Sequence, residues 1–247
     1  MVDDLGRGGL AASALNWFGE RTSVDLEEFS ALCPFRSWKS NRPNGRWFDQ
    51  LATRLTADSN QAITSRIAEM RGLSGEQEQA HTLLAALREA IRQGASTAGA
   101  RKAAVVAFTL TSQRINSEEG DFGGDFAIAY YVDHDGSVHE RLILCQAKVV
   151  SERRTSITTD QRTDLRASCL MMRQLVPDAS FGVYFEIDRS HLQADRCEAT
   201  REARLPSSSA RPFAAVLQGL WTFQEGQTID PATITEHRKV LVVLAST

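Results

Sequence analysis

A hairpin of two apolar strands, joined by an Asp-Gly turn, is the feature that most constrains the fold of this chain. The turn at residues 133–136 contains Asp135-Gly136, and this pair readily adopts the positive φ angles that tight hairpin turns need. The flanking stretches, 126–132 and 140–148, are therefore expected to fold back on each other as antiparallel strands. Because residues 142–145 are apolar on both faces, we expect the second strand to be central and covered on both sides.

The hairpin brings polar side chains to its open end. Side chains alternate across a strand, so Gln146 and Lys148 share one face of the second strand. Asp125 follows a glycine pair and starts the first strand, so antiparallel pairing places it near Gln146 and Lys148. A glutamine and a lysine are costly to bury without partners, and we therefore expect the three side chains to meet in one polar site.

This arrangement resembles the PD-(D/E)xK nuclease superfamily, in which an acid at a strand start is followed, after a hairpin, by (Glu/Gln)-x-Lys. The chain carries the Gln-x-Lys variant of the motif, with Asp125, Gln146 and Lys148. Glu119, or its neighbour Glu118, fits the additional upstream carboxylate of many members. The resemblance covers residues 103–187 and implies a restriction-endonuclease-like fold.

The order of predicted elements is that of an α/β protein with a mixed central sheet flanked by helices. Apolar residues recur every three or four positions in the first hundred residues, which predicts a mainly helical region over 1–100. The nuclease core is expected over 101–247. Helices are predicted at 49–70, 75–92, 160–175 and 213–223, and strands at 103–110, 126–132, 140–148, 181–187 and 240–244.

The resemblance implies an Mg²⁺-dependent endonuclease, with Mn²⁺ as the alternative ion. Asp125 would be the principal metal ligand, joined by Gln146, the backbone carbonyl of Ala147 and Glu119. Lys148 would orient or help deprotonate the attacking water, or stabilise charge developing on the phosphate. A carboxylate-bound divalent cation serves the remaining needs of phosphodiester hydrolysis, which are charge neutralisation and formation of a hydroxide.

Nucleic acid, and DNA in particular, is the predicted partner, although RNA stays open. The net charge of −3 gives no overall attraction for a polyanion, so local cations must supply it. Arg42 and Arg46 lie in an acid-free loop with aromatic residues, which suits phosphate and base contacts; the alternative is a loop whose aromatics pack and whose arginines are solvated. Gln161 and Arg162 at a helix start could also meet a phosphate.

Other interpretations remain beside the nuclease. Asp125 and Lys148 could form a simple cross-strand ion pair, and the neutral amide in the motif leaves room for a non-catalytic nucleic-acid-binding or assembly module that keeps the fold. His134 and His139 are interpreted as surface residues, and the serines at 207–209 as a loop.

The cellular setting is predicted from cysteine usage and hydropathy. The four cysteines are widely spaced without a Cys-x-x-Cys pair, which favours reduced thiols in a cytoplasm. No secretory leader and no apolar run long enough for a membrane helix are recognised, so no membrane partner is expected. A second copy of the chain or a partner protein stays open, and restriction or anti-phage defence is suggested by analogy alone.

Overall fold

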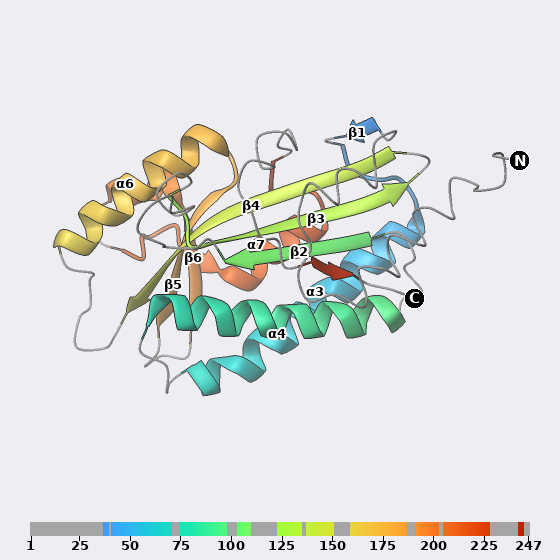
Figure 1. Cartoon of the computed structure of the whole chain (residues 1–247), viewed down its shortest axis with the longest axis horizontal. Helices are drawn as coiled ribbons and strands as arrows, with labels where there is room; N and C mark the ends of the chain where they lie inside the picture. Colours follow the sequence, from blue (N-terminus) through green and yellow to red (C-terminus); the bar gives the residue numbers. More distant parts are fainter. Residues whose placement is uncertain are drawn as a thin grey trace, which may run out of the picture.

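The computed structural model describes residues 37–39, 41–70, 75–97, 103–109, 123–134, 137–150, 159–186, 191–202, 205–227 and 242–244. Within these ranges the chain builds one mixed sheet of eight strands, flanked by helices (Figure 1). The predicted α/β class with a mixed sheet is confirmed at this coarse level. The proposed division of the chain at residue 100 stays a prediction.

Along the described part of the chain, a short strand and two long helices come first, and the other strands and helices follow. The helices are α3 (Arg46–Met70), α4 (Glu76–Thr97), α6 (Thr159–Leu175) and α7 (Phe213–Trp221), with the 3-10 helix η1 (Cys197–Arg201). The strands are β1 (Ser37–Lys39), β2 (Ala103–Thr109), β3 (Phe126–His134), β4 (Ser137–Val150), β5 (Ser180–Glu186), β6 (His191–Arg196), β7 (Arg211–Pro212) and β8 (Val242–Leu244).

Strand β4 is the centre of the sheet, as the apolar hairpin predicts. It pairs antiparallel with β3 from His134↔Ser137 to Phe126↔Cys145. Its other edge is shared by two parallel strands, β1 at the beginning and β5 from Leu144 onward. Residues 142–147 are all buried, so β4 is covered on both faces. The turn residues 135 and 136 lie outside the described residues.

Helix α7 covers one face of the sheet and is seen behind the strands in Figure 1. Tyr130 of β3 packs edge-to-face on Trp221 of α7, with ring centroids 5.2 Å apart. Trp221 in turn donates a hydrogen bond of 3.1 Å from Nε1 to Oγ of Ser59 in α3. The long helix α3 therefore packs against α7, and the hydrophobic core is continuous from the sheet through both helices.

The opposite face of the sheet carries the predicted motif. Because side chains alternate along β4, Gln146 and Lys148 point away from the α7 side. Helix α6 approaches this face, since its Met172 lies beside Gly124 and Leu144. The predicted apolar side of α6 is confirmed by the burial of Leu165 and Met172.

One prediction about the second half of the hairpin is wrong, and one strand has no counterpart in the sequence analysis. His139 was expected at the surface, but it is 4% exposed and its Nδ1 donates a 2.6 Å hydrogen bond to the backbone oxygen of Asn41. The sequence analysis also missed strand β6, which pairs antiparallel with β5. His139 can be buried because the backbone oxygen of Asn41 satisfies its ring N–H, as buried polar groups require.

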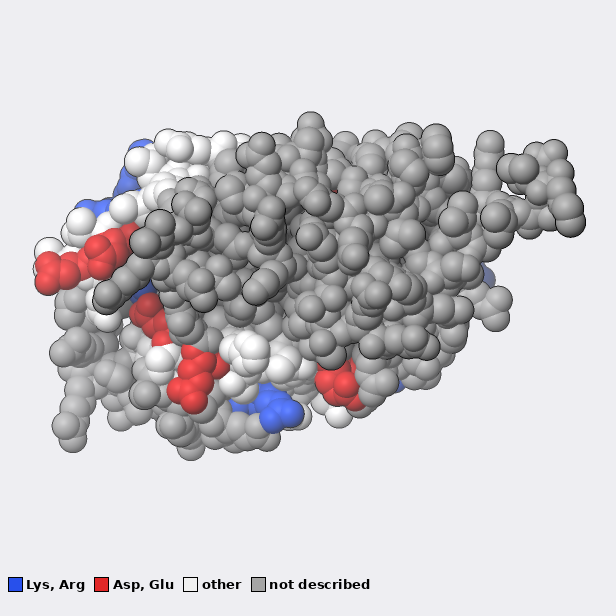
Figure 2. Space-filling model, viewed as in Figure 1, with Lys and Arg blue, Asp and Glu red and all other residues white. Residues whose placement is uncertain are grey.

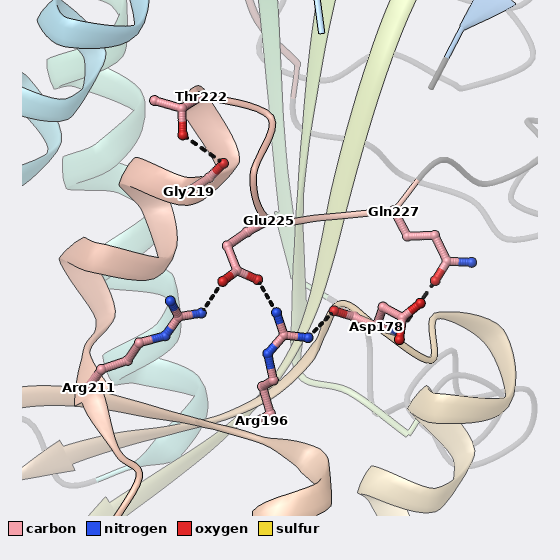
Figure 3. A network of polar contacts seen from close by, with 7 residues as sticks. All are labelled: Asp178, Arg196, Arg211, Gly219, Thr222, Glu225 and Gln227. Carbon is pink, nitrogen blue, oxygen red and sulfur yellow. Dashed lines mark hydrogen bonds and ion pairs between the residues drawn. The ribbon is translucent and has the colours of Figure 1, made fainter. Parts of the chain in front are cut away.

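A buried carboxylate, Glu225, joins the segment after α7 to the edge of the sheet (Figure 3). Arg196 of β6 donates to Glu225 Oε2 at 2.7 Å and to the backbone oxygen of Asp178 at 2.6 Å. Arg211 of β7 donates to the other carboxylate oxygen, and both guanidinium groups lie over the ring of Phe181. This network fixes α7 against strands β5 to β7.

Where described residues are visible in Figure 2, acidic and basic side chains are interspersed, and no continuous basic stripe is seen among them. In the part of the chain that the structure describes, no helix combines the length and apolar character needed to cross a membrane.

Candidate active site

The carboxylate of Asp125 closes the open end of the hairpin. Its Oδ2 accepts a hydrogen bond of 2.6 Å from the backbone N–H of Ala147 and one of 2.5 Å from Nε2 of Gln146. The backbone N–H of Asp125 donates to the carbonyl of Cys145 at 2.8 Å, one position beyond the last β3–β4 pair. Asp125 and Gln146 therefore meet, as the hairpin geometry predicts, and the third residue expected there, Lys148, contacts Glu76 of α4.

Two glycines let the chain reach this position. Gly123 has φ of 72°, and a Cβ on it would lie 2.6 Å from the backbone oxygen of Ser168 in α6. A Cβ on Gly124 would lie 3.1 Å from the carbonyl of Cys145 and from the sulfur of Met172. The segment before Asp125 thus passes between α6 and β4, where a larger residue would not fit.

The side-chain amide of Gln146 is oriented by Asp125. An ionised carboxylate only accepts hydrogen bonds, so the NH₂ group faces Asp125 and Oε1 points elsewhere. Gln146 is 3% exposed, and its Oε1 has no hydrogen-bond partner among the described residues. Buried oxygens are usually paired, and an unpaired one beside a carboxylate is a candidate ligand atom for a cation or a water.

Lys148 is paired with a carboxylate that the sequence analysis missed. Its Nζ lies 2.7 Å from Oε2 of Glu76, in the first turn of α4, and the two side chains are 10% and 31% exposed. Acidic residues are common in first turns because they complement the helix dipole, so the sequence offers no signal specific to Glu76.

The structure describes some of the remaining predicted site residues and leaves others outside the described ranges. Glu118 and Glu119 are outside the described residues. The carbonyl of Ala147 faces the Asp125 side of β4, because the N–H and C=O of one strand residue point to the same edge. Gln161 and Arg162 lie near the start of α6, where Arg162 donates to the backbone oxygen of Glu202 at 3.3 Å.

The basic loop before α3 is partly engaged in packing. Arg42 forms an ion pair with Asp49, and its guanidinium lies 5.2 Å from the ring centroid of Phe48. Phe48 is fully buried and so is not accessible to a nucleic-acid base, while Trp47 packs partly against the core. Arg46 is exposed at the start of α3. Phosphate binding by Arg42 and Arg46 stays a prediction.

The oxygen donors present suit Mg²⁺. Among the described residues no group of three or more His, Cys, Asp and Glu side chains is arranged to hold a metal ion. Mg²⁺ in proteins typically takes one or two carboxylates and keeps several waters or substrate phosphates. Asp125 supplies a carboxylate next to Gln146, whose Oε1 has no hydrogen-bond partner among the described residues, and Glu76 supplies a carboxylate that is paired with Lys148.

Comparison of the chain with protein-family models, with curated proteins and with solved structures gave no match. Asp125 contacts Gln146, and Lys148, two residues further along the same face of β4, contacts Glu76. Two polar contacts, Asp125 with Gln146 and Lys148 with Glu76, thus lie along one face of β4 near its end.

Proposed function

We propose that this protein is a metal-dependent nuclease with a restriction-endonuclease-like core, which hydrolyses phosphodiester bonds in DNA. The observation that carries the proposal is the Asp125 carboxylate, held by Gln146 and Ala147 at the base of the hairpin. The order of elements also supports it: helix α4, strands β2, β3 and β4, helix α6, then strand β5. This is the order that the resemblance leads one to expect.

Each side chain has a role in this chemistry. Asp125 and Glu76 would hold the ion, with the free oxygen of Gln146 as a neutral ligand. A divalent cation, when bound, neutralises phosphate charge and lowers the pKa of water. Lys148, kept in place by Glu76, would contact the attacking water or a phosphate oxygen. Hydrolysis joins the water oxygen to phosphorus and breaks the bond from phosphorus to the leaving oxygen.

A role in restriction or anti-phage defence is proposed by analogy alone and does not rest on the site itself. A cytoplasmic location is proposed from the widely spaced cysteines, which fit reduced thiols. The first proposal is tested by expressing the gene in cells challenged with foreign DNA, and the second by fractionating those cells.

A second candidate is a non-catalytic nucleic-acid-binding module. One observation favours it: the ammonium of Lys148 already has a carboxylate partner 2.7 Å away, and a neutral glutamine stands where many related nucleases have an acid. Such a protein would bind nucleic acid without cutting it.

The test is cleavage of supercoiled plasmid, linear duplex, single-stranded DNA and RNA in Mg²⁺, in Mn²⁺ and in a chelator. We expect cleavage of DNA with either metal, and its loss in Asp125→Ala and in Lys148→Ala. Asp164→Ala, an exposed acid on α6, is the matched control and keeps full activity. Undiminished cleavage by both site variants would exclude this site, and binding without cleavage under any divalent metal would favour the second candidate.

A further inference from the structure

A second buried polar atom without a partner lies beside Gln146. The hydroxyl of Tyr184 has no hydrogen-bond partner among the described residues, and neither has Oε1 of Gln146. Both side chains are buried. Each unpaired group lowers stability, and a polar molecule between the two would satisfy both.

The register of β4 and β5 places the two groups together. Gln146 pairs with Gly182, and Lys148 pairs with Tyr184, so these four positions form a square on one face of the sheet. Glycine leaves one corner of the square without a side chain. The Tyr184 hydroxyl occupies that corner, because a Cβ on Gly182 would lie 3.0 Å from it. The ring of Tyr184 is therefore turned back from the Lys148 row toward the Gln146 row.

Strand β6, next to β5, gives the Tyr184 hydroxyl no hydrogen bond. Asp195 of β6 is the register partner of Gly182, but its two carboxylate oxygens accept from the backbone N–H and the hydroxyl of Ser207, at 2.7 and 2.5 Å. Burial, with a contribution from Asp195, raises the pKa of Tyr184, and the phenol stays protonated at neutral pH. It is thus a hydrogen-bond donor at the Gly182 position, and Gly182 is the register partner of Gln146.

The donor and acceptor pattern identifies the ligand class. Oε1 of Gln146 accepts and the protonated phenol of Tyr184 donates, so a molecule between them must donate to one and accept from the other. A water molecule does both, and it is the smallest molecule that can bridge the two groups. The same position is next to Lys148, whose Nζ is held by Glu76.

We propose that Gln146 Oε1 and the Tyr184 hydroxyl bind one water molecule, and that this water is the nucleophile of the hydrolysis. The inference rests on the proposed function. The water donates one proton to Gln146 Oε1 and accepts from Tyr184, which leaves a lone pair to attack phosphorus. Its oxygen bonds to phosphorus, the bond to the leaving oxygen breaks, the second proton passes to solvent, and the leaving oxygen takes a proton from solvent.

The kinetic test compares Tyr184→Phe with Tyr130→Phe. Tyr130 is a matched control, because its hydroxyl is also buried without a partner among the described residues, but it faces α7. Tyr184→Phe should lower kcat by about 10- to 100-fold with KM unchanged, since the attacking water loses its orientation. Tyr130→Phe should keep the wild-type kcat. In Gly182→Ala the hydroxyl is present but displaced, and the same fall in kcat is expected.

A crystal structure of the wild-type protein at a resolution that shows ordered waters gives a readout independent of activity. We expect a water within hydrogen-bond distance of Gln146 Oε1 and the Tyr184 oxygen, and its loss in Tyr184→Phe. A direct hydrogen bond between the two side chains, or a wild-type kcat in Tyr184→Phe, would overturn the inference while leaving the nuclease intact. A wild-type protein that cleaves no nucleic acid would instead overturn the proposed function and the nucleophilic role, and the structure would then decide the water site.

Discussion

The ammonium of Lys148 lies 2.7 Å from the carboxylate of Glu76, although 72 positions separate the two residues in the chain. The contact brings the first turn of α4 to the end of β4. It keeps a lysine with little exposure in a defined position and places a second carboxylate beside the (Glu/Gln)-x-Lys lysine of the motif. A helix outside the hairpin thus contributes to the candidate site.

Glu76→Gln tests this contribution, because the amide keeps the shape of the side chain and removes its charge. We predict that cleavage activity falls by about 10- to 100-fold, as is typical when a supporting partner of a metal site is changed. Glu78→Gln, on the same turn of α4 but exposed, should behave like the wild type. Equal rates for the two variants would remove Glu76 from the site.

Gly123→Ala tests the path of the chain before Asp125. The left-handed φ of 72° costs a residue with a Cβ about 1–2 kcal/mol, and the Cβ would also meet the backbone of α6. We predict a loss of at least about 2 kcal/mol in the free energy of unfolding, measured by urea denaturation. In Gly75→Ala the nearest atom to the new Cβ is 3.9 Å away, so the change should stay within about 0.5 kcal/mol. Similar values for both would show that Gly123 is not sterically confined.

Glu225→Ala tests the network that fixes α7 to the sheet edge. Two arginines lose a shared carboxylate, and since they are partly exposed we predict a loss of about 1–3 kcal/mol in the free energy of unfolding. Glu198→Ala is the control: its pair with Arg173 is 3.7 Å long, and Glu198 is 55% exposed. That pair should contribute less than about 1 kcal/mol. Thermal or urea unfolding measures both losses. A larger loss in Glu198→Ala than in Glu225→Ala would contradict this role of Glu225.

The hairpin and its base are predictable from the sequence because the signals are local. The Asp-Gly pair in the sequence predicts the pairing of β3 with β4, alternation then puts Gln146 and Lys148 on one face, and the glycines before Asp125 permit its approach. Helix α6 is predictable for the same reason, since its apolar residues repeat with the helical period.

The parts that sequence reasoning missed depend on long-range contacts. Glu76 is one of several acids on α4, and nothing in its neighbours indicates that it meets Lys148. Strand β6 carries the charged Asp195, which is buried because Ser207 donates to it twice. In the sequence, Tyr184 is an ordinary aromatic residue of a strand. Only the structure shows that its hydroxyl lies next to Gly182. Such pairings follow from tertiary structure, which a local pattern does not specify.

The central claim is that the oxygens gathered around Asp125 hold a divalent cation. Mn²⁺ titration followed by electron paramagnetic resonance measures this directly, without a substrate. The account predicts one Mn²⁺ bound per wild-type chain, displaced by Mg²⁺, lost in Asp125→Ala and kept in Asp164→Ala. Binding of Mn²⁺ by Asp125→Ala with wild-type affinity would contradict it.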